Sequence, residues 1–254
     1  MSTQLAANAI ETHGLTKDFA GFRAVAGVDL RLEAGRVHAL VGPNGAGKTT
    51  LFNLLTGFFR PSGGRILLFG DDVTGLTPDR IARRGVARSF QITSLFDQLT
   101  ALEHAALALQ AGSALGFRFW RSDRALRQFA RRASELLEEV GLGAVASRLA
   151  GSLPYGQKRA LELALAIALD PRLLLLDEPT AGMGLEDVRR TIDLIRRVRG
   201  GRTVVLVEHN MGVVAELADQ VIVLQQGRVI AQGTYATVRE DPAVVTAYLG
   251  QSHA

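Results

Sequence analysis

The sequence has 254 residues and no cysteine, which excludes disulfide bonds and agrees with a reducing compartment. Long hydrophobic runs are also lacking: the most apolar stretch, residues 161–169, includes Glu162 and is too short to cross a bilayer. Residues 1–11 do not have the pattern of a signal peptide. A net charge of only +4 argues against binding to nucleic acid, which requires a basic surface. We therefore expect a chain that reaches a membrane only through a partner.

Lysine is scarce as well. Among the 29 basic residues only Lys17, Lys48 and Lys158 are lysines, so a lysine at a defined motif position is informative. Lys48 belongs to a segment that matches the phosphate-binding pattern G-x-x-x-x-G-K-[ST]. The matching residues, with the threonine that follows them, are Gly42-Pro43-Asn44-Gly45-Ala46-Gly47-Lys48-Thr49-Thr50.

This loop contains the residue types that binding of ATP requires. Glycines let the backbone curl so that successive N–H groups point at phosphate oxygens, and the helix that starts near Lys48 directs its positive dipole end at the same anion. We expect Lys48 to contact the β- and γ-phosphates and the Thr49 hydroxyl to bind Mg²⁺. A strand at residues 37–41 and an apolar helix at residues 49–56 flank the loop, as the motif requires.

A second motif places two carboxylates at the end of a buried strand. The four leucines of residues 173–176 are typical of a strand that is buried on both faces, and Asp177 and Glu178 follow them. Open α/β sheets bind ligands at the carboxyl ends of their strands. We predict that Asp177 holds Mg²⁺, directly or through water, and that Glu178 is the general base for the attacking water.

Strand and helix patterns alternate along most of the chain, which predicts an α/β fold. A hairpin is expected at residues 220–231, with its turn at Gln226-Gly227. Between residues 99 and 149 the strand signals vanish and helical spacing takes over, and residues 157–169 form a further helix. We therefore predict a single domain, residues 1–254, with an inserted α-helical subdomain at approximately residues 99–170.

Together these motifs resemble the ABC ATPase family. Asp177-Glu178-Pro179-Thr180 follows, by about twenty residues, a pentapeptide that is similar to the family signature Leu-Ser-Gly-Gly-Gln, namely Leu153-Pro154-Tyr155-Gly156-Gln157. Gln91 resembles the Q-loop glutamine and His209 the switch histidine, and all of these motifs occur in the family order. The resemblance implies a P-loop RecA-like core, an antiparallel β region and a helical lobe that holds the signature.

The resemblance also implies roles for individual residues. His209 would donate a hydrogen bond to the γ-phosphate, and Gln91 would touch Mg²⁺ or the attacking water. Phe19, or less favourably Phe22, would stack on adenine. Two subunits would enclose two ATP molecules, and the signature of one subunit, Leu153 to Gln157, would contact the ATP that is bound to the phosphate loop of the other.

Three positions depart from the family pattern. Pro154 replaces the signature serine, Tyr155 replaces a glycine, and Gly184 stands where an aspartate usually ends the D-loop. The serine hydroxyl that would meet the γ-phosphate is therefore missing. Proline is nevertheless favoured at a helix start. The backbone amides of Tyr155, Gly156 and Gln157 are therefore still expected to face the γ-phosphate.

Residues 86–91, the helical insert and the ending at residues 241–250 resemble the larger ATPase subunit of bacterial branched-chain amino acid importers. This resemblance implies integral-membrane permease subunits, a second ATPase subunit of the same or another kind, and indirectly a periplasmic binding protein. It also implies a peripheral location at the cytoplasmic face of the inner membrane. The alternatives are a urea or amide importer, a lipopolysaccharide exporter, a soluble ABC ATPase outside transport and a non-enzymatic nucleotide-binding scaffold.

A contact with the permease is expected between Gln91 and Trp120. Ile92, Leu95 and Phe96 are apolar residues in what we expect to be an exposed loop, and aromatic residues recur at 117–120. The alternative is that these residues close the small core of the helical subdomain itself. An apolar groove beside Gln91 is the kind of surface that receives an amphipathic helix.

Overall fold

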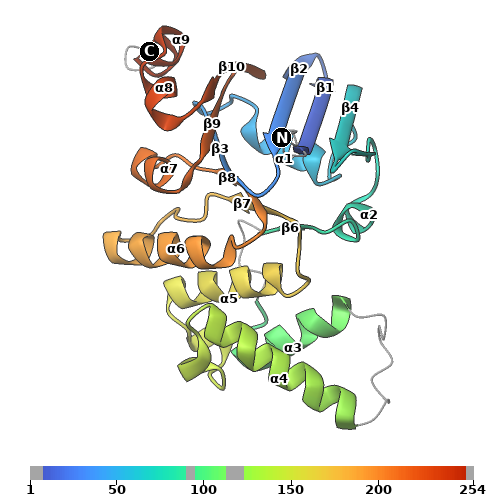
Figure 1. Ribbon diagram of the computed structural model, residues 1–254, viewed down its shortest axis with the longest axis vertical. Coiled ribbons are helices and arrows are strands. Elements are labelled where there is room, and N and C mark those ends of the chain that lie inside the picture. The colour runs from blue at the N-terminus through green and yellow to red at the C-terminus, as the bar shows by residue number, and fades with distance from the viewer. Residues whose placement is uncertain (1–7, 90–94, 113–122, 250–254) are drawn as a thin grey trace, which may run out of the picture.

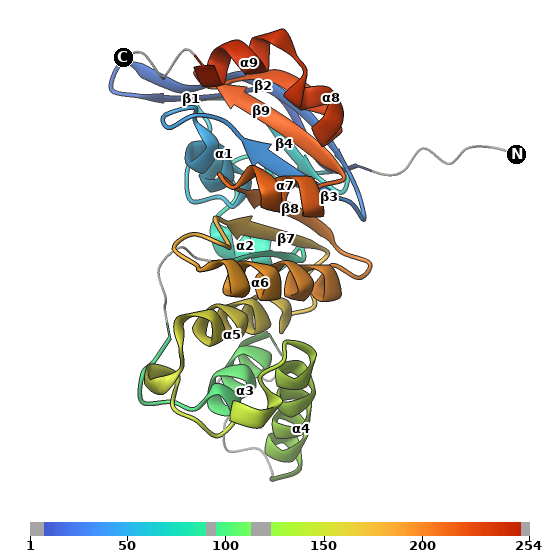
Figure 2. The same ribbon diagram turned by 90° about the vertical axis from the view of Figure 1, so that its left-hand side faces the viewer.

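A computed structural model describes residues 8–89, 95–112 and 123–249. Figure 1 shows two β-sheets with their helices in the upper part of the molecule and a group of helices in the lower part. Figure 2, turned by 90°, shows the same separation. The fold is α/β, as predicted.

The larger sheet has six strands within the described residues, in the order β10-β9-β3-β8-β7-β6. Neighbouring strands are parallel except for the β9–β10 hairpin. Its strands are β3 (Val37–Val41), β6 (Val86–Arg88), β7 (Leu173–Asp177), β8 (Thr203–Val207), β9 (Gln220–Gln225) and β10 (Arg228–Gly233). Every residue of β3, β7 and β8 is buried, which explains why these strands are apolar runs.

The hairpin was predicted correctly. Gln225 pairs with Arg228, and the two residues between them, Gln226 and Gly227, have φ angles of 47° and 74°. Positive φ at both central residues is the requirement of the tight turn that matches the twist of two antiparallel strands.

The smaller sheet is antiparallel, in the order β2-β1-β4-β5. Its strands are β1 (Asn8–Phe19), β2 (Phe22–Glu33), β4 (Gly63–Leu68) and β5 (Asp71–Asp72). In the sequence, the alternation of apolar and polar residues at 28–32 and the strand pattern at 65–69 indicate this sheet. Strand β1 was missed because several register shifts interrupt its pairing with β2, so its residues do not alternate regularly between buried and exposed.

Helices cover the larger sheet and continue below it. Near the sheets lie α1 (Lys48–Leu55), α2 (Pro78–Ala82), α6 (Leu185–Val198), α7 (Met211–Leu217), α8 (Tyr235–Arg239) and α9 (Pro242–Leu249). The lower part of Figure 1 contains α3 (Ala101–Gly112), α4 (Asp123–Glu139) and α5 (Tyr155–Ile167), with the short 3₁₀ helices η1 (Gly143–Val145) and η2 (Ala150–Ser152).

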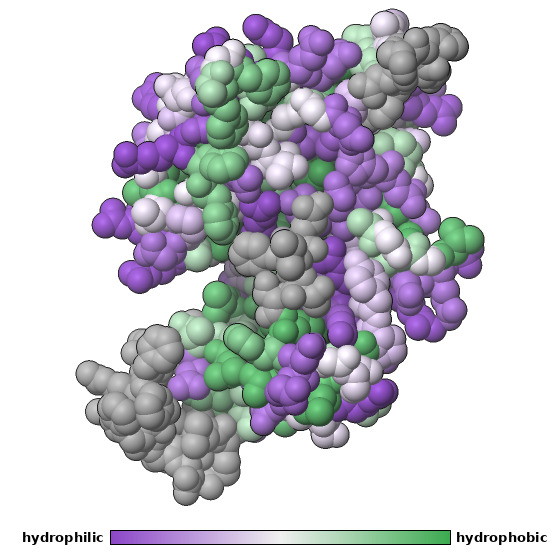
Figure 3. Space-filling model, turned by 180° about the vertical axis from the view of Figure 1, so that it is seen from behind, coloured by the Kyte–Doolittle hydropathy of each residue, from purple (hydrophilic) through white to green (hydrophobic). Residues whose placement is uncertain are grey.

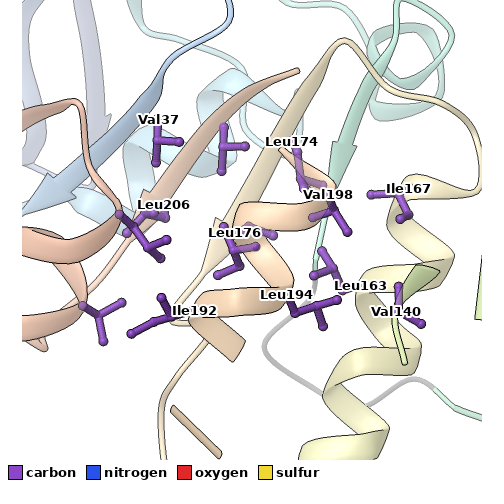
Figure 4. Close-up of a cluster of buried hydrophobic side chains, with 14 of the residues drawn as sticks. Val37, Val140, Leu163, Ile167, Leu174, Leu176, Ile192, Leu194, Val198 and Leu206 are labelled. Carbon is purple, nitrogen blue, oxygen red and sulfur yellow. The ribbon is translucent and has the colours of Figure 1, made fainter. Parts of the chain in front are cut away.

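One hydrophobic cluster joins the sheet to the helical part. Figure 4 shows Leu174 and Leu176 of β7 facing α6. Leu163 and Ile167 of α5 belong to the same cluster and complete the contact between the sheet and the helical part. Burial of each such side chain contributes about 1.5–3 kcal/mol. The helical part is therefore held against the sheet by a continuous core. That the helical part is a subdomain with bounds near residues 99 and 170 stays a prediction. In its favour, the described residues between β6 and β7 include no strand of either sheet.

Candidate functional site

The sheet register brings the two sequence motifs to one edge. Asp177 at the end of β7 pairs with Val207 at the end of β8, and Val207 pairs with Leu40 of β3. Because all three strands are parallel, the segments that follow them leave the sheet side by side. These segments are the phosphate loop after β3, Glu178 after β7 and His209 after β8.

The phosphate loop has a backbone that only glycine permits at two positions. Gly42 and Gly47 have φ angles of 149° and 99°. A Cβ on Gly42 would collide with the carbonyl oxygen of Leu224, and one on Gly47 would collide with the carbonyl oxygen of Ala24. The loop is therefore wedged between β2 and the β9–β10 hairpin, and helix α1 begins directly at Lys48.

Lys48 folds back over this loop. Its ammonium donates hydrogen bonds to the carbonyl oxygens of Gly42, at 2.7 Å, and Pro43, at 2.9 Å. Burial lowers the pKa of Lys48 from its usual value, and the carboxylates of Glu178 and Asp177 oppose that shift. The Lys48 ammonium thus lies close enough to both carboxylates to interact with them electrostatically. Thr49 on the next position of α1 is exposed.

Asp177 is buried and has a partner that the sequence did not indicate. Arg88 Nη2 lies 2.7 Å from Asp177 Oδ2, and the other terminal nitrogen of Arg88, Nη1, donates to Asn53 Oδ1 at 2.6 Å. Arg88 ends β6, and Asn53 belongs to α1. The carboxylate predicted to hold Mg²⁺ is therefore fixed between the sheet and the helix of the phosphate loop.

Glu178 and His209 contact each other directly. His209 Nε2 lies 2.9 Å from Glu178 Oε1, and both side chains are partly exposed. Glu178 has a φ of 47°, which is unusual for a residue other than glycine, and its N–H donates to the carbonyl oxygen of Val207. The structure thus brings the predicted base and the predicted switch histidine into one pair, while their catalytic roles stay predictions.

Phe19 lies at the tip of the β1–β2 hairpin. Its ring contacts Phe59 edge-on, with centroids 5.3 Å apart, and the Lys17 ammonium lies 4.9 Å from its centroid. Phe22, the second candidate for adenine stacking, is more exposed than Phe19. Either ring is available to a planar base, and no contact in the structure decides between them.

The signature residues lie at the start of α5. The helix begins at Tyr155, two residues before the start that we predicted, and Pro154 is its N-cap. The N–H groups of the first helical turn therefore have no partners within the helix, as the anion-binding hypothesis requires. Leu153 is buried, and the Tyr155 hydroxyl donates to the carbonyl oxygen of Ala181 at 3.1 Å. The tyrosine that replaces a glycine thus connects the signature to the D-loop segment.

Some predicted residues cannot be placed. Gln91 and Ile92 lie outside the described residues, and so do residues 117–120. Leu95 is half-buried and packs against the large hydrophobic cluster, so it is less exposed than we predicted. Phe96 is 65% exposed and stacks on His104.

The side chains at this edge fit Mg²⁺ bound together with nucleotide. Within the described residues, no group of three or more His, Cys, Asp or Glu side chains gathers as a metal site. A magnesium ion is often held by only one or two carboxylates, with its other positions taken by phosphates and water. The Asp177 carboxylate and the Thr49 hydroxyl have oxygen atoms of the kind that Mg²⁺ prefers, and their role as ligands stays a prediction. The loop backbone and Lys48 would supply the phosphate contacts.

Two contributors to the site were not predicted. Arg88 lies within residues 86–91, in which the sequence indicates a role in the site only for Gln91, and Glu208 directly precedes His209. Glu208 is buried and accepts hydrogen bonds from Thr180 and from the backbone after β8. The sequence signal that could have indicated Glu208 is a charged residue directly after the apolar strand β8.

The chain is similar to known ATP-binding proteins of transporters. A family model described as ABC transporter matches residues 25–181, and one described as branched-chain amino acid ATP-binding cassette transporter matches residues 228–254. The high-affinity branched-chain amino acid transport ATP-binding protein BraF of Pseudomonas aeruginosa is 42% identical, with 96% of this chain and 98% of the relative covered. The corresponding protein LivG of Escherichia coli K12 is 40% identical with the same coverage.

Solved structures agree with this result. An ATP-binding cassette of an ABC transporter in its ADP conformation is 28% identical, with a TM-score of 0.83 and coverage of 96% of this chain and 99% of that one. A dimeric cassette in a post-hydrolysis state with ADP and phosphate is 25% identical, with a TM-score of 0.75 and coverage of 89% and 98%.

Proposed function

The chain belongs to the ABC transporter family of ATP-binding proteins, and from this premise we propose that it is the ATP-hydrolysing subunit of an importer for branched-chain or related amino acids. One observation carries the enzymatic part of this proposal. Glu178 and His209 lie 2.9 Å apart at the sheet edge that also carries the phosphate loop.

The chemistry assigns a task to each group. Bound Mg²⁺ would neutralise charge on the β- and γ-phosphates. Lys48 would move from the loop carbonyls to the phosphates, where its charge is better matched. Glu178 would accept a proton from the attacking water, and His209 would donate its N–H to the γ-phosphate in place of Glu178 once nucleotide is bound. The first-turn amides of α5 would contact the ATP bound to a second subunit.

Import of amino acids is supported by the relatives. BraF and LivG match nearly the whole chain, and the match at residues 228–254 is to a family model named for branched-chain amino acids. The urea, lipopolysaccharide and non-transport alternatives have no comparable support here. A non-enzymatic scaffold is disfavoured because Lys48, Asp177, Glu178 and His209 are all present and are arranged around one edge.

The transport role requires permease subunits, a second ATPase subunit and, at the outer face, a periplasmic binding protein. Among the described residues, no helix combines the length and the apolar character that a membrane span needs. The proposed location is peripheral, at the cytoplasmic face of the inner membrane through contact with the permease, and it is supported by the similarity to transport ATP-binding proteins.

An apolar groove is the proposed permease contact. It has a volume of about 470 Å³ and lies between the sheets and the helical part, where Figure 3 shows the surface hollowed with apolar atoms beneath the hollow. The residues that line it come from α2, β6, α5 and the segments that follow α1, β6 and α5, and they include Ile81, Arg88, Leu95, Leu165 and Leu169. Such a groove suits the apolar face of an amphipathic helix.

Reconstitution tests the proposal. The chain is combined with candidate permease subunits and a candidate periplasmic binding protein from the same organism, and uptake of leucine and of urea into vesicles is measured with and without ATP. ATP-dependent uptake of leucine, absent with the Glu178→Gln variant, is the expected result. Uptake of urea alone would replace the proposed substrate class and leave the ATPase assignment intact.

A further inference from the structure

Glu208 is a buried carboxylate that neither the phosphate loop nor the Glu178–His209 pair uses directly. It follows β8 and is only 3% exposed. A buried charge of this kind is costly unless hydrogen bonds satisfy it. Here both of its oxygens are engaged, and the donors come from two different loops.

One oxygen binds the loop that carries Glu178. Oε1 accepts from the Thr180 hydroxyl at 2.6 Å and from the Thr180 N–H at 3.1 Å. The other oxygen, Oε2, binds the loop that carries the switch histidine, and it accepts from the N–H groups of His209 at 3.0 Å and Asn210 at 3.3 Å. Glu208 thus connects the segment two residues after Glu178 with the backbone of His209 itself.

The backbone of Glu178 explains why such a connection is needed. Its φ of 47° places a non-glycine residue in the left-handed region. A residue held there costs about 1–3 kcal/mol and persists only where its surroundings fix it. The Glu178 N–H donates to Val207 and its carbonyl oxygen accepts from the Ala181 N–H, and the loop between Glu178 and Ala181 is anchored by the contact of Thr180 with Glu208.

We propose that Glu208 is a positioning residue that sets the distance and orientation between Glu178 and His209. This inference rests on the proposed ATPase function and extends it to a residue that does not touch the nucleotide. Without the carboxylate, the two loops lose their common acceptor, and the Glu178 backbone is held less firmly in the left-handed region. Hydrolysis would fall while nucleotide binding by the phosphate loop remains.

The test compares four single variants of the full chain in its transporter complex. Glu208→Gln replaces one acceptor oxygen by an amide donor, and Thr180→Val removes only the hydroxyl contact. Thr180→Ser keeps that hydroxyl. The matched control is Thr12→Val, which removes another buried hydroxyl, one that donates to Val28 in the smaller sheet. For each variant, kcat, the dissociation constant for ATP and the thermal unfolding midpoint are measured.

We expect Glu208→Gln to lower kcat by at least about tenfold, the effect of roughly one hydrogen bond to a charged group, with the ATP dissociation constant within about twofold of wild type. Thr180→Val should lose kcat to a smaller extent, and Thr180→Ser should retain more activity than Thr180→Val. Thr12→Val should lower only the unfolding midpoint.

The positioning role is overturned if wild type hydrolyses ATP and Glu208→Gln hydrolyses it at the same rate, or if kcat and ATP affinity fall together. If Glu208→Gln does not fold, the two Thr180 variants decide, and equal kcat values for them overturn the proposal. A wild-type chain that binds no ATP would overturn the proposed function instead, so the two failures are distinguishable.

Discussion

Arg88 and Asp177 form a buried ion pair, with Nη2 and Oδ2 2.7 Å apart and side-chain exposures of 12% and 2%. The two residues are 89 positions apart in the sequence and meet because β6 and β7 are parallel neighbours. Arg88 also lines the groove proposed for the permease. The side chain that fixes the predicted magnesium ligand is therefore in reach of a partner that enters this groove.

Removal of Arg88 should be costly, because it leaves the Asp177 carboxylate buried without its counter-charge. We expect Arg88→Met to lower the free energy of unfolding by about 3–5 kcal/mol, measured by urea denaturation. The control is Arg190→Met, which breaks an exposed pair with Glu186 and should cost less than about 1 kcal/mol. Equal small losses for both variants would contradict the role assigned to the buried pair.

Lys48 is expected to determine nucleotide affinity. Lys48→Ala removes the cation from the β- and γ-phosphates, and a hydrogen bond to a charged group contributes about 1.5–3 kcal/mol. We expect the dissociation constant for MgATP to rise by at least about tenfold in calorimetric titration of the isolated subunit. Lys158→Ala changes a lysine of α5 outside the phosphate loop and should bind like wild type. Unchanged affinity of Lys48→Ala would show that the loop does not hold phosphates.

Glu178→Gln should separate binding from hydrolysis. The amide keeps the shape of the side chain but does not accept a proton, and loss of a general base costs about 10²–10⁴-fold in rate. We expect kcat to fall by that factor while MgATP still binds, and an ATP-bound dimer to accumulate in size-exclusion chromatography. Wild-type turnover by this variant would require another base.

The sequence predicted those parts of the site that are written in consecutive residues. The phosphate loop and the Asp177–Glu178 pair each occupy one strand end, so spacing and residue type identified them. The contacts of Arg88 and Glu208 could not be predicted, because they depend on which strands are neighbours in the sheet. The irregular register of β1 hid that strand for a related reason, since bulges disturb the alternation from which strands are recognised.

Phe96 offers a cleaner test of permease docking than Leu95. Leu95 lines the groove but packs against the core, so a charge there would also destabilise the fold. Phe96 follows Leu95 directly in the chain, does not itself line the groove and is largely exposed. We expect Phe96→Glu to abolish stimulation of ATPase activity by the permease and to leave basal activity and the unfolding midpoint unchanged. Leu107→Glu, at an exposed position of α3 outside the groove, should keep full stimulation. Stimulation of Phe96→Glu at the wild-type level would place the contact elsewhere.

His38 should make stability depend on pH. It is fully buried in β3, with Nε2 2.9 Å from the Glu33 carbonyl oxygen and Nδ1 3.0 Å from Gln220 Oε1. Burial lowers its pKa, although both hydrogen bonds oppose this shift. In the unfolded chain a histidine has a pKa of about 6.5, so below that pH the unfolded chain binds more protons than the folded chain. The contribution of His38 to the free energy of unfolding is therefore fully present above about pH 6.5. It is lost progressively as the pH falls toward the lower pKa of the folded state.

The measurement is urea denaturation at about pH 7.5 and about pH 5.5. Wild type should lose more stability over this interval than His38→Gln, in which the titrating group is gone. His13→Gln is the matched control, because His13 is substantially exposed and its replacement should leave the wild-type pH dependence in place. If His38→Gln shows the same dependence as wild type, the buried imidazole is not its source.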